Sequence, residues 1–329
     1  SAVSGGVAVA MAWAGCGVWS LVGQRLAAMG VKAALLWMLS DWRPAGRYDG
    51  RALRAMAPYS LRLLATDLIS TLYNNISQLY VGKMYSAEML GFFNQGQKLK
   101  DLPVTATIQS VQNVSFPALS KIREEPAKFA EGYRQLLLMV AFVVSPVMLG
   151  MVAVAEDLFA LFLGEKWMPT VPYFEILSLS GLFMPLAMVA CNVLKARSDG
   201  SVIVRLEVVK KSIQTLILAV SIPCGVRAIA WGVVAMAFCE LALNLRAARR
   251  FAELPLGRII GAVVPAFVLA LAMFGAVRLC GDLVPLALPL LLLTKILLGA
   301  VLYIGLSLAF WLEAAQVALG MLRRMRERS

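Results

Sequence analysis

The sequence has no histidine and few charged residues, and both shortages limit the functions open to it. Histidine is the side chain that most often acts as a general base or metal ligand near neutral pH, and the chain has none. Charged residues make up 15% of the chain and hydrophobic residues 60%, whereas soluble domains average about 25% and about 45–50%. The composition therefore excludes an ordinary soluble fold and argues against catalysis.

The few cysteines form no pattern that is typical of a site. None of them has the CxxC spacing of metal or redox centres, and all but one lie well inside apolar stretches, where a thiol acts as a small hydrophobic group. The five are Cys16, Cys191, Cys224, Cys239 and Cys280. We expect no disulfide, no metal site, no cofactor and no catalytic residue.

Long apolar runs dominate what is present. A helix needs roughly 17–25 apolar residues to cross the hydrocarbon core of a membrane, and about ten runs approach that length. We expect helices at about 4–21, 23–40, 57–82, 101–119, 136–163, 172–194, 206–222, 227–245, 259–280 and 285–312. The predicted fold class is an all-α, polytopic transmembrane helix bundle.

The basic residues are distributed unevenly between alternate connections. Cytoplasmic loops carry the excess of Lys and Arg. Every second connection between the predicted helices, together with the C-terminal tail, holds 21 of the 31 Lys and Arg residues, and the connections between them hold 6. The first count includes Lys210 and Lys211, as residues that flank a predicted helix. The second includes Lys98, in an outer connection at 83–98, and Lys100, just after it. Both ends of the chain are therefore predicted to be cytoplasmic. The net charge of +12 needs no nucleic acid to explain it.

Polar side chains recur every three or four residues on two successive predicted helices, which places them along one face of each. Ionisable groups within a membrane usually face a bundle interior or an aqueous cavity. The first stripe comprises Asp67, Thr71, Asn74 and Gln78, with Arg62 about a turn away, and the second comprises Thr105, Gln109, Gln112 and Asn113.

Two interpretations of these stripes remain open. Interhelical hydrogen bonds, at about 0.6 kcal/mol each, hold membrane helices together, while a wet cavity lined by amides and hydroxyls suits a hydroxyl-rich ligand. Asp67 either pairs with Arg62 or titrates during transport. Arg25 and Lys32, two turns apart on the second helix, either attract an interior anion or extend to the membrane interfaces.

Several short motifs resemble one known family. They are Tyr73–Asn75, Tyr80–Lys83, Leu90–Gln97, Phe116–Lys121, Leu163–Trp167 and Val171–Tyr173. In order and spacing the chain from about residue 15 to 250 resembles the polysaccharide transporters of the Wzx type, within the multidrug/oligosaccharidyl-lipid/polysaccharide (MOP) exporter superfamily. The similarity is to the subgroup that handles colanic acid, lipopolysaccharide or teichuronic acid precursors.

The resemblance implies a bacterial inner-membrane flippase with two helical lobes around a central, partly cationic cavity. Its substrate would be undecaprenyl-diphosphate-linked oligosaccharide for O-antigen, exopolysaccharide or capsule, with membrane lipids and other polysaccharide-assembly proteins as candidate partners. It also implies an incomplete N-terminal lobe, and the chain begins without Met or a signal-peptide n-region. On this basis residues 1–56 end the N-terminal lobe, 57–250 form the C-terminal lobe, and 251–329 add two helices and a basic tail.

Three other functions are weighed against the flippase. A multidrug cation antiporter of the same superfamily shares the architecture but favours acidic cavity groups, whereas Arg25, Lys32 and Arg62 outnumber the interior acids. A membrane enzyme such as a polymerase would be expected to carry a large outer loop or clustered acids, and neither is found. A non-transporting scaffold remains an alternative that the sequence leaves open.

Overall fold

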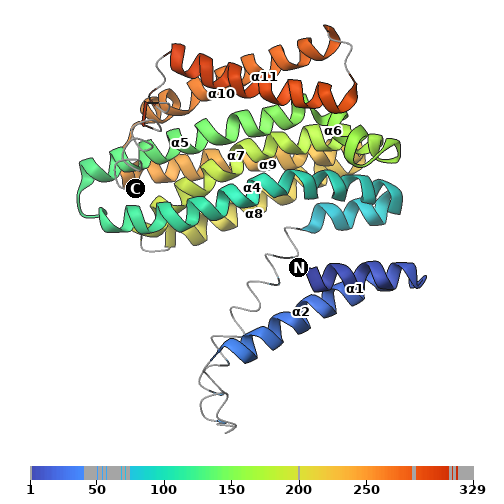
Figure 1. The fold of residues 1–329 in the computed structure, drawn as a ribbon. Coiled ribbons are helices and arrows are strands. Elements are labelled where there is room, and N and C mark those ends of the chain that lie inside the picture. Colours follow the sequence, from blue (N-terminus) through green and yellow to red (C-terminus); the bar gives the residue numbers. More distant parts are fainter. Residues whose placement is uncertain are drawn as a thin grey trace. The chain divides into compact units, whose positions relative to one another are not determined.

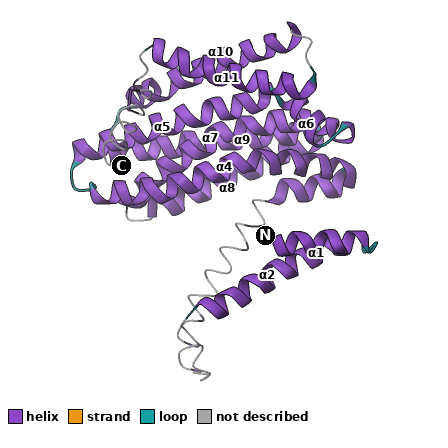
Figure 2. Ribbon diagram, in the orientation of Figure 1, coloured by secondary structure: helices purple, strands orange, loops and turns teal. Residues whose placement is uncertain are grey.

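The chain was analysed as a computed structural model, which describes residues 2–40, 50, 54, 57, 68, 71, 75–198, 201–283, 287–310, 313, 316 and 317. All regular secondary structure in these residues is helical (Figure 2). Contacts divide the chain into two units, Ser1–Asp67 and Leu68–Ser329. Each unit is described by itself.

The first unit contains two packed helices, α1 (Ala2–Trp13) and α2 (Trp19–Leu39). The turn between them uses Gly15 and Gly17, whose φ angles of +76° and +52° suit a residue without a side chain. At Gly23 the side chain of Met11 lies where a Cβ would be, so this glycine lets α1 approach α2 closely.

The second unit is a bundle of longer helices (Figure 1). A helical segment at 75–84 leads into it. The elements that follow are α4 (Ala87–Lys121), α5 (Pro126–Ala153), α6 (Ala155–Phe162), the 3-10 helix η1 (Glu165–Thr170), α7 (Val171–Arg197), α8 (Ser201–Ser221), the 3-10 helix η2 (Ile222–Cys224), α9 (Val226–Ala252), α10 (Leu256–Leu283) and α11 (Leu288–Ala309).

Helix α7 forms the centre of this bundle, because it packs against α4, α5 and α9. Its buried Leu186, Val189 and Val193 belong to the main hydrophobic core. Gly96 of α4 allows one of these close approaches, since a Cβ there would lie 3.1 Å from the backbone nitrogen of Phe174 in α7. Helix α10 packs on α5, and α11 packs on α10.

Five helical segments of the described chain are long and apolar enough to cross a membrane, and they include α5, η1 with α7, α9, α10 and α11. Only 22% of the most apolar stretch of α11 is buried within the protein. A surface as apolar as this is stable against lipid rather than water. The expectation of an all-α transmembrane helix bundle is thus confirmed.

Several predicted boundaries are wrong. The first helix, expected at 4–21, ends at Trp13, and the second, expected to begin at 23, begins at Trp19. The helix expected at 136–163 is two helices, α5 and α6, which break at Val154. The outer connection expected at 83–98 is largely helical, because Ser86 caps the start of α4 by accepting a hydrogen bond of 3.1 Å from the backbone N–H of Met89. Lys98 and Lys100 therefore lie within α4. The sequence of its first turns was interpreted as a loop because it is too polar for a lipid-facing helix.

Candidate functional site

The polar side chains of α4 line a cavity on one face of the second unit. Its volume is about 510 Å³, and we call it the amide pocket. It is lined by Gln78, Asn94, Gln97, Lys98, Asp101, Leu102, Thr105, Ala106 and Gln109. All of these except Gln78 come from α4, at the three- and four-residue spacing that puts side chains on one helical face.

The amide pocket joins parts of the two predicted stripes. Gln78 represents the first stripe, and Thr105 and Gln109 represent the second. The Gln78 side chain donates a hydrogen bond of 3.1 Å from Nε2 to Oε1 of Gln97, so the two helices meet through their amides. The structure therefore places these three predicted residues around one cavity.

The other predicted site residues lie elsewhere or outside the described residues. Gln112 donates from Nε2 toward Sδ of Met188, at 3.5 Å. Thr71 and Asn113 are exposed and do not line the amide pocket. Arg25 and Lys32 are exposed on α2, in the first unit. Arg62, Asp67 and Asn74 lie outside the described residues.

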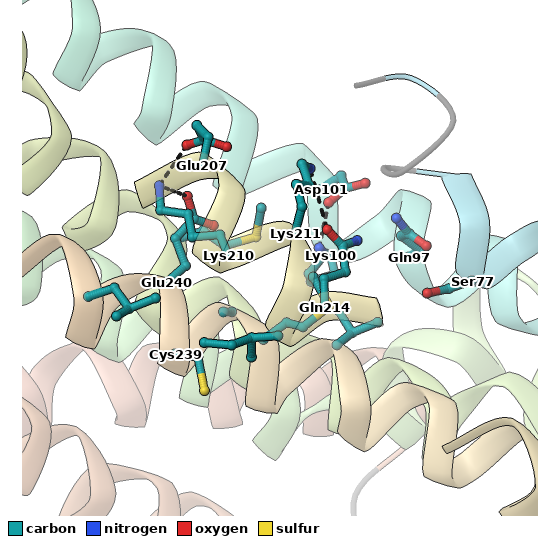
Figure 3. Close-up of a pocket in the computed structure, with 16 residues that line it drawn as sticks. Ser77, Gln97, Lys100, Asp101, Glu207, Lys210, Lys211, Gln214, Cys239 and Glu240 are labelled. Atoms are coloured by element: carbon teal, nitrogen blue, oxygen red, sulfur yellow. Dashed lines mark hydrogen bonds and ion pairs between the residues drawn. The ribbon is translucent and has the colours of Figure 1, made fainter. Parts of the chain in front are cut away.

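A second cavity adjoins the first, because Gln97 and Asp101 line both. Its volume is about 310 Å³, and we call it the lysine pocket. It lies between α4, α8 and α9, and its polar lining consists of Ser77, Gln97, Lys100, Asp101, Glu207, Lys210, Lys211, Gln214, Cys239 and Glu240 (Figure 3).

Each lysine of this pocket contacts an oxygen of a neighbouring side chain. Nζ of Lys100 lies 2.7 Å from Oδ1 of Asp101. Nζ of Lys210 lies 2.8 Å from Oε1 of Glu207 and 3.4 Å from that of Glu240. Figure 3 shows Lys210 between these two glutamates. Such pairing reduces the cost of placing charge within a membrane bundle.

Sequence reasoning missed the lysine pocket for identifiable reasons. Lys100 was assigned to an outer connection, and Lys210 and Lys211 to the cytoplasmic flank of a helix beginning at 206. Because α8 begins at Ser201, Lys210 is near its middle. The available signal was Glu207 three residues before Lys210, a spacing that places an acid and a base side by side on a helix.

Acidic residues of α6 and α7 pair with basic residues of the last two helices. Nζ of Lys295, in α11, lies 2.5 Å from Oδ2 of Asp157, and the two side chains are only 11% and 13% exposed. Arg278, in α10, pairs with Glu175 and lies 3.8 Å from Glu156. These pairs attach α10 and α11 to the rest of the bundle, and they give Lys295 an acidic partner.

The site chemistry is that of reversible binding. Amides and hydroxyls donate and accept hydrogen bonds, and ammonium groups attract oxyanions. Within the described residues no group of three or more His, Cys, Asp or Glu side chains is arranged to hold a metal ion.

Comparisons with known proteins agree with this architecture. A family described as polysaccharide biosynthesis proteins matches residues 1–172. The chain is 29% identical over 172 residues to the teichuronic acid biosynthesis protein TuaB of Bacillus subtilis, covering 51% of this chain and 36% of TuaB. It is 28% identical over 134 residues to the lipopolysaccharide biosynthesis protein WzxC of Escherichia coli, covering 40% and 27%. The aligned segments thus span about a third of these relatives.

The fold also matches a solved structure over most of its length. The chain is similar to the lipid II flippase MurJ in an inward closed conformation, with a TM-score of 0.70 and 14% sequence identity. The match covers 94% of this chain and 66% of MurJ. At this identity the similarity concerns the fold.

Proposed function

Because the chain belongs to the family of polysaccharide biosynthesis proteins, we propose that it forms part of a flippase for lipid-linked oligosaccharide units. The substrate class is an undecaprenyl-diphosphate-linked oligosaccharide, which moves across the bacterial inner membrane for surface polysaccharide synthesis. Both ends of the chain are cytoplasmic in this proposal, following the distribution of Lys and Arg. The activity is transport rather than catalysis.

The observation that carries the proposal is the junction of the amide pocket and the lysine pocket within a transmembrane unit. Sugars present hydroxyl groups, for which Gln78, Gln97 and Gln109 supply both donors and acceptors. A diphosphate requires cationic donors, which the lysines supply. The polyprenyl chain is as apolar as the membrane, so it can remain in lipid while the polar part is bound.

In transporters of this kind, two helical bundles rock around a midplane site that is exposed to each face in turn. We assign residues 1–56 to the end of one lobe, 57–250 to the second lobe and 251–329 to an added helical pair and tail. Arg25 and Lys32, on α2, remain candidate cavity residues of the first lobe in this scheme. Arg62, Asp67 and Asn74 remain candidate cavity residues.

A multidrug cation antiporter is the second candidate, and the lysine pocket argues against it. A site for organic cations needs carboxylates that are free to pair with the ligand. In the described part of the bundle, Glu207 and Glu240 share Lys210, and Asp101 pairs with Lys100. Each of these acids is therefore already in contact with a lysine.

Complementation tests the proposal. The full-length gene that contains this chain is expressed in a bacterial strain lacking its own flippase, and surface polymer and accumulated lipid-linked intermediate are measured. We expect restored polymer and a cleared intermediate. Gln97→Ala with Gln109→Ala should reduce both effects, whereas Gln135→Ala, on α5 away from both pockets, should not. A well-expressed protein that restores nothing with several repeat units would contradict the proposal.

A further inference from the structure

Helix α9 has one exposed face that runs along most of its length. Exposed residues recur on it every three or four positions, a spacing that places their side chains in one line. They are Trp231, Ala235, Phe238, Ala242, Arg246 and Arg250. Only 33% of the most apolar stretch of α9 is buried within the protein. The face is therefore apolar over most of its length, where it meets lipid, and basic at its end.

The arginines at this end have no acidic partner among the residues that the structure describes. Arg246 and Arg250 are exposed and four positions apart, so their Cβ atoms lie about 6 Å from each other. Arg249 lies beside them and is half-buried. Of the acids nearest in sequence, Glu240 contacts a lysine of α8. Glu253 follows the helix end, in a left-handed conformation with a φ of 53°.

Other basic residues at the same end of the bundle are already engaged. Arg197 donates from Nε to the backbone oxygen of Arg123 at 2.9 Å, and from Nη1 to that of Phe251 at 2.8 Å. It thereby satisfies a carbonyl at the end of α9, a role that basic residues in a last turn often have. Lys128 lies 2.6 Å from Glu125. The preference of cytoplasmic ends for Lys and Arg explains how many basic residues lie here, but not why those on the lipid-facing line are unpaired.

The spacing along this face fits one leaflet of a membrane. Phe238 precedes Arg246 by eight positions, which is about 12 Å along a helix, and half the hydrocarbon core is about 15 Å thick. The ring of Phe238 packs edge-on against Phe183, at 5.6 Å between centroids. Ala235 and Ala242, on either side of it, have small side chains that leave room for an acyl chain.

We propose that Arg246 and Arg250 bind the phosphate of an anionic membrane phospholipid, whose acyl chain lies along the exposed apolar face of α9. A guanidinium group donates two parallel hydrogen bonds to phosphate oxygens. A zwitterionic lipid carries its own cation, which two arginines repel, so an anionic headgroup fits better. This lipid is distinct from the transported molecule. In the topology proposed above it belongs to the cytoplasmic leaflet.

Photolabelling of the purified full-length protein that contains this chain tests the site. The probe is phosphatidylglycerol with a diazirine in its acyl chain, added in mixed micelles, and labelled positions are mapped by peptide mass spectrometry. We expect labelling within 231–246. The double variant Arg246→Gln with Arg250→Gln should need about tenfold more probe or higher for half-maximal labelling, because charge-assisted hydrogen bonds are lost. Arg123→Gln with Lys128→Gln removes the same charge at the same end and should label like the wild type.

Comparison probes decide whether the site selects an anionic lipid. Equal labelling by the phosphatidylcholine analogue overturns the preference for an anionic headgroup. Inorganic phosphate that displaces the probe at the concentration at which the lipid itself binds indicates a site for free anions, and this also overturns the proposal.

A second pair of variants separates the shape of the guanidinium from its charge. Arg246→Lys with Arg250→Lys keeps both charges but removes the planar donor group, so labelling should weaken by several-fold, less than in the glutamine variant. Wild-type labelling in both double variants overturns the proposal and leaves the arginines as determinants of topology alone. The midpoint of thermal unfolding, measured without phosphatidylglycerol, shows whether each variant is folded.

This inference and the proposed function fail in different ways. If the protein complements a flippase-deficient strain but the arginine variants label like the wild type, the lipid site is refuted and transport stands. If labelling depends on Arg246 and Arg250 but complementation fails with several repeat units, the lipid site stands and the proposed function is refuted.

Discussion

Replacing Lys295 by methionine removes the positive partner of a buried carboxylate, and we expect this single change to destabilise the protein strongly. Nζ of Lys295 lies 2.5 Å from Oδ2 of Asp157, and both side chains are nearly nine-tenths buried. Breaking a buried ion pair by removing one partner costs about 3–5 kcal/mol, because the remaining charge is uncompensated. Methionine has a similar length, so little of this loss arises from a cavity.

The double replacement Lys295→Met with Asp157→Leu separates charge from packing. Apolar residues of similar volume in place of a buried pair are often neutral or stabilising, by about 1–4 kcal/mol. We therefore expect the double variant to recover most of the stability that Lys295→Met loses. Local space limits the choice of residue, because Lys295 Cε lies 2.5 Å from where a Cβ on Gly281 would be.

The assay is unfolding of the purified protein in mixed micelles of increasing SDS content, followed by circular dichroism. Lys128→Met is the matched control, because Lys128 lies 2.6 Å from Glu125 but the side chains are 70% and 55% exposed. Exposed pairs contribute only about 0–1 kcal/mol. The reasoning is refuted if Lys295→Met unfolds like the control, or if the double variant is as unstable as the sum of its single changes.

Two further predictions concern packing and pH. Gly96→Ala should lower stability by about 1–3 kcal/mol, because the new Cβ would lie 3.1 Å from the Phe174 backbone nitrogen, which cannot move as a side chain can. Gly91→Ala on the same helix, with nothing within 4 Å, is the control for the same unfolding measurement. Hydrogen bonding to Arg134 holds the pKa of Glu313 below its usual value. The stabilising effect of that lowered pKa is therefore complete above the unfolded-state pKa and declines as the pH falls through the folded-state pKa. From neutral to acidic pH, the unfolding midpoint should fall less for Glu313→Gln than for the wild-type protein. An unchanged pH dependence would contradict the assignment.

The sequence predicts those features that depend on residues near one another along the chain. Helical spacing on α4 led to Thr105 and Gln109, and the structure places both in the amide pocket with Gln78. Hydropathy alone could not locate the start of α4, because its first turns contain too many polar and glycine residues to form an apolar run. The helix break at Val154 was also missed, since both sides of it are apolar.

Pairings between distant residues could not be read from the sequence. Lys210 has the spacing of an ordinary cytoplasmic flanking residue, and only the packing of α8 on α9 brings it to Glu240. Lys295 is isolated in its own helix, and its partner Asp157 is 138 positions away. The distribution of Lys and Arg predicted which loops are cytoplasmic. The partners of individual lysines, and so their roles, could be assigned only from the folded bundle.

Gln97 and Asp101 line both pockets, and this has an energetic consequence. A group that engages either side chain in one pocket changes what that side chain offers in the other. Occupancy of the two pockets is then thermodynamically linked, and the linkage is reciprocal: whatever one ligand group does to the affinity for the other, the second does equally to the first. One molecule that fills both pockets therefore binds with an affinity that two separate fragments would not predict. The coupling passes through Gln97 and Asp101, which are about one helical turn apart on α4.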